Sequence, residues 1–320
     1  MTNLRARLAS NVRVTDRAVR YATTAALLMS IIIVVTGGAV RLTGSGLGCP
    51  EWPACVPGSL TPTAEMGVHG LIEFGNRMLT WVLCAAVGAV ILTARLHPEE
   101  RRGLTRLGLA QLGLVGANAA LGGITVLTGL NPYIVATHFL LAMALIAVAT
   151  YTWHRARDGD MTAALLVPTG IWRLTWVVVG LVALLLVTGT LVTGAGPHAG
   201  DSGEVHRIPL EWESVTRLHA LVAVGTLGMA VVLRRALATT PNGPAGAKKA
   251  ASFLLAILAA QAVIGYVQYL TNLPELIVAT HLLGAALVWV AALHLTATLR
   301  GGRPFGVRAG AERDPSAFGD

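Results

Sequence analysis

The chain has 320 residues, of which 54% are hydrophobic and only 12% are charged, and its mean hydropathy is +0.65. A soluble domain needs more charge than this to cover its surface, so the composition excludes an ordinary soluble protein. The net charge of +8 does not indicate a nucleic-acid partner, because most basic residues lie in the N-terminal arm, in every second loop and in the tail.

Eight apolar runs follow a basic arm at residues 1–20. Each run is long enough to cross the hydrocarbon core of a bilayer, which takes about 20 residues of helix. The expected spans are 21–41, 67–93, 105–127, 134–153, 172–194, 214–233, 251–270 and 277–298. The first run is long and lacks a clear cleavage site, so we expect a span and not a signal peptide. The pattern predicts an all-α polytopic membrane protein.

Charge alternates from one connection to the next along the chain. Arginine and lysine gather in the arm, in every second loop and in the tail, whereas the other loops hold acids such as Glu51, Asp201 and Glu275. This is the positive-inside pattern. It predicts a protein of the cell (plasma) membrane with both termini in the cytoplasm. The arm and the tail, residues 299–320, are expected to be disordered.

The two halves of the chain resemble each other. The segment NAALGGITVLTGLNPYIVATH from Asn118 aligns without a gap with QAVIGYVQYLTNLPELIVATH from Gln261, at an offset of 143 residues. The segment HGLIEFGNRML from His69 can be laid on HALVAVGTLGM from His219, at an offset of 150. A third recurrence joins TGGAVRLTGSG from Thr36 to TGTLVTGAG in the second half.

This duplication predicts two pseudo-symmetric four-helix bundles. They cover residues 21–153 and 172–298, and a cytoplasmic linker at 154–171 joins them. In such proteins the functional sites lie inside a bundle or between the repeats.

Four of the nine histidines lie a few residues inside the outer ends of even-numbered spans: His69, His138, His219 and His281. The alignments map His69 onto His219 and His138 onto His281. Ionisable residues in spans are costly and usually functional, and imidazole is a common haem ligand. Two matched pairs therefore predict two haem-iron sites, one per bundle. The alternative is that each histidine hydrogen-bonds neighbouring helices. Zinc or copper is less attractive, because no carboxylate or thiolate cluster joins either pair.

The other five histidines carry weaker signals. We expect His97 and His154 to be solvated and His294 to be structural, and the third outer loop contains His198 and His206.

The second span holds Glu73, Asn76 and Arg77 on or near the helical face of His69. An intramembrane glutamate could orient a ligand, move a proton or assist chemistry; alternatively it forms a buried ion pair with Arg77. The offset of 150 places Ala223 opposite Glu73. The carboxylate would then occur in the first half only, and we expect that half to be the reactive one.

The first outer loop reads TGSGLGCPEWPAC. Cys49 and Cys55 face an oxidising space and are expected to form a disulfide, with two free thiols as the alternative. Cys84 lies inside the second span as an inert thiol. The loop itself could be a lid over the bundle, or its aromatic residue an interfacial anchor.

From about residue 21 to 298 the chain resembles the haem A synthase family, in an actinobacterial-like form. The motifs that carry the resemblance are TGGAVRLTGSGLGCPEWPAC (36–55), HGLIEFGNR (69–77), LGGITVLTGL (121–130), RLH (217–219) and the two VATH segments.

The resemblance implies an oxidoreductase that converts the methyl group of haem O to the formyl group of haem A by successive hydroxylations, with water as the oxygen source, for cytochrome oxidase assembly. It implies haem b as cofactor on His219 and His281, and substrate haem O in the first half on His138. Glu73 matches the family's glutamate and is the candidate catalytic acid/base or proton path, and Cys49 with Cys55 matches the family's disulfide. The farnesyltransferase that makes haem O is an expected partner, with the lipid bilayer and an unknown electron acceptor. The oligomeric state is open, with a homo-oligomer as one option.

One residue departs from the family pattern. Many members have a ligand histidine where this chain has Asn76. We therefore expect either that His69 is the ligand or that His138 holds the substrate iron from one side only. A di-haem electron-transfer protein and a haem carrier or assembly factor are the alternative functions.

Overall fold

The computed structural model describes residues 14–99, 101–158, 164–201, 203, 205–241 and 243–301. Over these residues the chain is all-helical, with eight long helices and the short 3₁₀ helix η1 (Ala64–Met66). The long helices are α2 (Asp16–Leu42), α3 (Gly67–Leu96), α4 (Arg102–Leu127), α5 (Pro132–Asp158), α6 (Thr169–Ala195), α7 (Trp212–Thr239), α8 (Ala245–Leu270) and α9 (Glu275–Thr298). All eight are long and apolar enough to cross a membrane, which confirms the predicted fold class.

Helix α2 begins five residues before the expected span. Thr15 caps it, because its hydroxyl oxygen accepts the backbone N–H of Ala18 at 3.3 Å. The helix therefore extends into the basic arm. The expected disorder of the arm and tail otherwise concerns residues 1–13 and 302–320, which lie outside the described residues.

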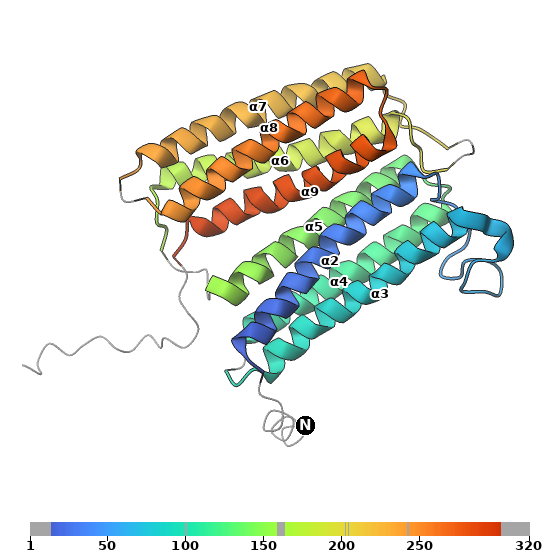
Figure 1. Cartoon of the computed structure of the whole chain (residues 1–320), viewed down its shortest axis with the longest axis horizontal. Coiled ribbons are helices and arrows are strands. Elements are labelled where there is room, and N and C mark those ends of the chain that lie inside the picture. The colour runs from blue at the N-terminus through green and yellow to red at the C-terminus, as the bar shows by residue number, and fades with distance from the viewer. Residues whose placement is uncertain are drawn as a thin grey trace, which may run out of the picture.

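The helices pack in the order in which they follow one another. Helix α3 contacts α2 and α4, α5 contacts α4 and α2, and α6–α9 contact one another in the same cyclic way. We call these sets the N-terminal group and the C-terminal group. They meet where α9 contacts α2 and α5 and where α5 contacts α6 (Figure 1).

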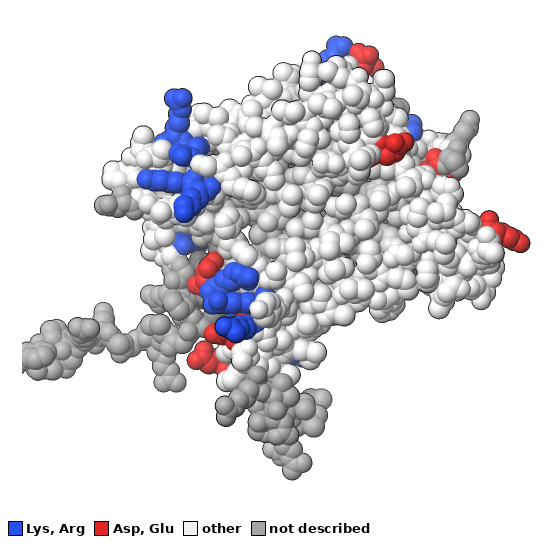
Figure 2. Space-filling view, in the orientation of Figure 1, with Lys and Arg blue, Asp and Glu red and all other residues white. Residues whose placement is uncertain are grey.

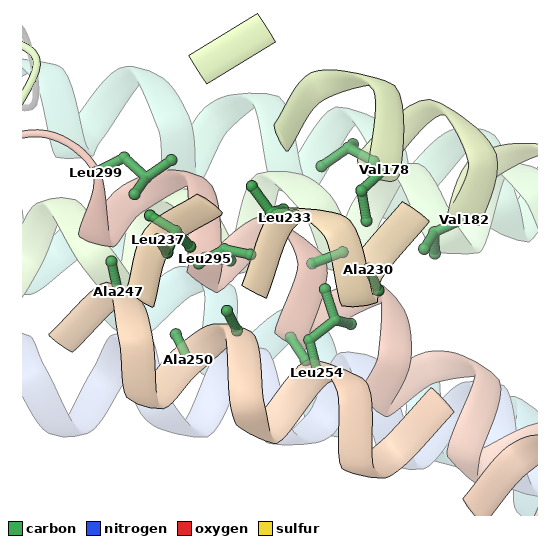
Figure 3. Close-up of a cluster of buried hydrophobic side chains, with 14 of the residues drawn as sticks. Val178, Val182, Ala230, Leu233, Leu237, Ala247, Ala250, Leu254, Leu295 and Leu299 are labelled. Atoms are coloured by element: carbon green, nitrogen blue, oxygen red, sulfur yellow. The ribbon is translucent and has the colours of Figure 1, made fainter. Parts of the chain in front are cut away.

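Each group has its own apolar core. In the C-terminal group, leucines from three helices belong to one buried cluster with Val178 (Figure 3): Leu233, Leu254 and Leu295, all at most 1% exposed. Another cluster joins the two groups, and there the Trp289 indole N–H donates to the carbonyl oxygen of Met143 at 2.9 Å. The hydrogen bond of the Trp289 indole and the close packing of this cluster stabilise the contact between the two groups.

The outer surface is that of a membrane protein. Large apolar side chains such as Trp81 and Leu221, both 70% exposed, point away from the cores. Figure 2 shows the charged side chains gathered towards the two ends, with an uncharged band between them. A lipid-facing surface needs such a band, because charge within the hydrocarbon region is costly.

Helices α3, α4 and α5 correspond to α7, α8 and α9 at one offset, whereas α2 and α6 differ by 153 residues at both ends. Adding 143 to residue numbers carries α4 onto α8 at both ends, the start of α5 onto the start of α9, and the end of α3 onto the end of α7. The offset of 150 that we expected for the second span is therefore wrong by seven residues, or about two helical turns. At the observed offset His219 corresponds to Asn76, and Thr216 corresponds to Glu73.

Candidate functional site: buried imidazoles at the long-loop end

The connections at residues 43–66 and 196–211 lie at the same end of the helices, which we call the long-loop end. In the C-terminal group, His219 of α7 and His281 of α9 lie about two turns inside this end. Nδ1 of His219 is 2.9 Å from the hydroxyl oxygen of Thr188. That hydroxyl is also 3.0 Å from the carbonyl oxygen of Leu184, and when it donates there its oxygen accepts from Nδ1–H of His219. Nε2 of His219 is then the unprotonated nitrogen, as metal ligation requires.

Glycines make room beside both imidazoles of the C-terminal group. A Cβ added at Gly189 would lie 3.5 Å from Cε1 of His219, and one at Gly265 would lie 3.3 Å from Cε1 of His281. Nδ1 of His281 is buried and has no hydrogen-bond partner among the residues that the structure describes. A buried nitrogen without a partner is costly, so hydrogen bonding within the described residues does not explain why His281 is buried.

The N-terminal group repeats part of this arrangement. A Cβ at Gly122 would lie 3.3 Å from Cε1 of His138, as at Gly265 and His281. Nδ1 of His138 is likewise buried, and the imidazole interacts with the backbone of Asn118. In the second span, Asn76 receives a hydrogen bond on Oδ1 from the Thr36 hydroxyl at 2.8 Å.

His69 lies in a different environment. It is the third residue of α3 and is exposed. Its Nδ1 is 2.9 Å from the hydroxyl oxygen of Ser45 in the first loop. With Met66 and Asp201 it lines an open hollow of about 250 Å³. The structure therefore places His69 against the loop, about 10 Å along the helix axis from Asn76.

Glu73 is buried and both of its carboxylate oxygens have partners. Oε2 accepts the backbone N–H of Cys49 at 2.6 Å, and Oε1 accepts from Arg77 at 2.5 Å. The Arg77 guanidinium also donates to the carbonyl oxygens of Cys49 at 3.0 Å and Ala54 at 2.9 Å. The structure thus contains the buried ion pair, and the pair anchors the first loop to α3.

The first loop is closed by the Cys49–Cys55 disulfide, as expected, and Cys84 is a free thiol. The indole of Trp52 lies directly on Gly123 of α4, one residue from the glycine that faces His138. The loop therefore reaches over the N-terminal site. The composition of the loop indicated a lid. The position of the Trp52 indole, packed against Gly123 where a Cβ would otherwise lie, comes from the structure.

The loops of the two groups are joined at this end. Nε of Arg41 donates to the carbonyl oxygen of His198 at 2.5 Å, and its Nη2 donates to Thr193 at 2.6 Å. Nε2 of His198 is 3.0 Å from the carbonyl oxygen of Leu273. His198 is thus a connecting residue, whereas His206 is exposed.

A second histidine pair lies at the opposite end of the helices. His154 is 4% exposed, so the expectation that it is solvated is wrong. Its Nε2 is 3.0 Å from Nδ1 of His294, and its Nδ1 is 3.1 Å from Asp158. The pair joins α5 to α9 where the two groups meet, and only the packing of distant segments brings it together.

The fold and site together define a polytopic helical membrane protein with buried imidazoles at one end of both helix groups. A model of the cytochrome oxidase assembly protein family (COX15-CtaA) matches residues 20–293. The chain belongs to this family.

Several relatives carry the name Heme A synthase. The chain is similar to the one from Azorhizobium caulinodans, at 28% identity over 87% of this chain and 93% of the relative. It is also similar to one from Staphylococcus aureus (strain bovine RF122 / ET3-1), at 24% identity over 81% and 88%. The alignment with the Geobacillus kaustophilus protein, at 32% identity, spans 39% of this chain and 38% of that relative. The match to the Geobacillus thermodenitrificans protein likewise spans 42% of its length.

Proposed function

We propose that the protein is a haem A synthase that oxidises the methyl group of haem O to the formyl group of haem A. The observation that carries this proposal is a repeated arrangement: His138 lies beside Gly122 and His281 lies beside Gly265, each with a buried Nδ1 in an apolar helix group. Imidazole nitrogens in an apolar, glycine-lined space suit a porphyrin and its iron. Membership of the family supports the same function.

The two groups would have different roles. His219 and His281 would hold haem b as a resident cofactor, which supplies electron transfer when bound. His138 would hold haem O in the N-terminal group, and the sequence leaves open whether His69 is a second ligand or His138 holds the iron from one side only. This division rests on Glu73, which has no carboxylate counterpart in the C-terminal group because Thr216 takes its position.

The reaction sets requirements for the protein. Converting a methyl group and one water to a formyl group releases four electrons and four protons in two hydroxylation steps and a dehydration. Glu73 is a candidate for an acid/base or proton path, and its anchoring of the first loop would exclude bulk water. The electrons pass to an acceptor that this chain does not identify, and the haem O-producing farnesyltransferase would supply the substrate. We place the protein in the cell membrane with both termini in the cytoplasm.

The test is to purify the protein from a host that makes haem O and to analyse the extracted haem by mass spectrometry. The formyl product should be present with the wild-type protein and lost in Glu73→Ala. Haem without any formyl product would favour a di-haem electron-transfer protein or a haem carrier instead.

A further inference from the structure

We propose that Asn76 occupies the ligand position of the second span in the N-terminal group. The site around His138 would then present one imidazole and one carboxamide, and would leave one axial position of a bound haem open to a small exchangeable ligand such as water. This inference rests on the proposed function only in taking haem as the bound group.

The first argument is the register of the helices. The offset of 143 that superposes the bounds of α4 on α8 also carries His138 onto His281 and Asn76 onto His219. The same offset carries Gly122 onto Gly265, the two glycines that face the fourth-span histidines. The helices that carry these residues therefore repeat at one offset, α3 to α5 in one group and α7 to α9 in the other. At that offset His69 corresponds to Trp212.

The second argument is the contacts of the first span of each group. Thr36 of α2 hydrogen-bonds Asn76, and Thr188 of α6 hydrogen-bonds His219. The next residue is a glycine in both cases. A Cβ at Gly37 would lie 3.9 Å from Nδ2 of Asn76, and one at Gly189 would lie 3.5 Å from Cε1 of His219. A threonine and a glycine thus hold the carboxamide in one group and the imidazole in the other.

The third argument is that His69 has another contact. Its ring is exposed and pairs with Ser45 of the first loop, beside the open hollow at the protein surface. It lies seven positions before Asn76, which is about 10 Å of helix. Ligation by His69 would require α3 to slide by about two turns, and the Glu73–Arg77 anchor on the first loop opposes such a movement.

The chemistry of a carboxamide differs from that of an imidazole. An asparagine side chain both donates and accepts hydrogen bonds, and iron is held in proteins mainly by imidazole, thiolate, thioether or phenolate. Asn76 would therefore hydrogen-bond a small ligand at the open position and would not close that position itself. A site of this kind lets water approach the haem in the N-terminal group, whereas the imidazoles of His219 and His281 exclude it in the C-terminal group.

The test is carbon monoxide binding by the full-length protein, purified from a host that makes haem O and reduced with dithionite. Carbon monoxide binds only where an axial position is open or weakly held. Wild-type protein should show one carbon monoxide-reactive haem and one unreactive haem. Asn76→His should abolish most of the reactive fraction and add a low-spin, bis-imidazole absorption spectrum.

Two further variants complete the design. His219→Asn copies the N-terminal arrangement into the C-terminal group and should create a second reactive haem. His69→Ala should leave the spectrum and the reactive fraction unchanged. The proposal is overturned if wild-type haem is wholly unreactive, if Asn76→His leaves the reactive fraction unchanged, or if His69→Ala opens a position. These outcomes are separate from the proposed function, which fails if the haem-loaded protein makes no formyl product.

Discussion

Trp52 and Gly123 are in direct contact: a Cβ added at Gly123 would fall 2.3 Å from Cδ2 of the indole. The residues come from the first loop and from α4, 71 positions apart in the chain. In the C-terminal group the residue that corresponds to Gly123 is Tyr266, so among the described residues the glycine contact of Trp52 has no counterpart at that position. The lid is therefore a property of the proposed substrate half.

Gly123→Ala should displace the indole and loosen the first loop. Overpacking of this kind typically costs about 1–3 kcal/mol. We expect faster proteolysis within residues 43–66 and loss of haem O, with the haem b spectrum retained. Gly116→Ala on the same helix is the matched control, because a Cβ there meets nothing within 4 Å. Equal behaviour of the two variants would contradict the lid.

Arg77→Gln should destabilise the protein strongly. It removes the guanidinium from a buried pair whose Glu73 side chain is 7% exposed, and leaving one member of a buried pair costs about 3–5 kcal/mol. Thermal unfolding in detergent measures the effect. Arg217→Gln is the control, because its pair with Glu213 has the same spacing but is 76% and 53% exposed. Exposed pairs contribute about 0–1 kcal/mol, so similar losses in the two variants would rule out the anchor.

Thr188→Val should weaken haem binding in the C-terminal group. The change removes the acceptor for Nδ1–H of His219, and losing such a supporting hydrogen bond typically lowers metal affinity about 10–100-fold. Haem retention during dilution, followed by Soret absorbance, measures this. Thr190→Val is the control, since that hydroxyl bonds only the backbone of its own helix. The supporting role is refuted if haem dissociates at the same rate from both variants.

His294→Leu should destabilise the junction between the two groups without changing haem content. Nε2 of His154 would lose its partner, and an unsatisfied buried group costs about 1–3 kcal/mol. The haem-to-protein ratio should stay at the wild-type value, because the proposed haem sites lie at the long-loop end. A loss of haem in this variant would show that the two ends are coupled.

Much of the candidate site was predictable from residue type and position. Four intramembrane histidines stood out because charge and polarity are rare in spans, and the disulfide followed from the expected compartment of Cys49 and Cys55. The axial register of the second span was not predictable. The segments from His69 and from His219 share too few residues to exclude a shift of two turns, which keeps the same helical face.

The sequence by itself determined that this chain is a membrane protein with eight spans, because the bilayer sets the length and polarity of each helix and both can be read locally. Only the tertiary structure decided which side chains meet. Thr36 reaches Asn76, Arg77 holds the disulfide loop and His154 joins His294 because helices distant in the chain pack side by side. Such contacts depend on the rotation and axial position of every helix against its neighbours, which the hydrophobic pattern of a single span does not encode.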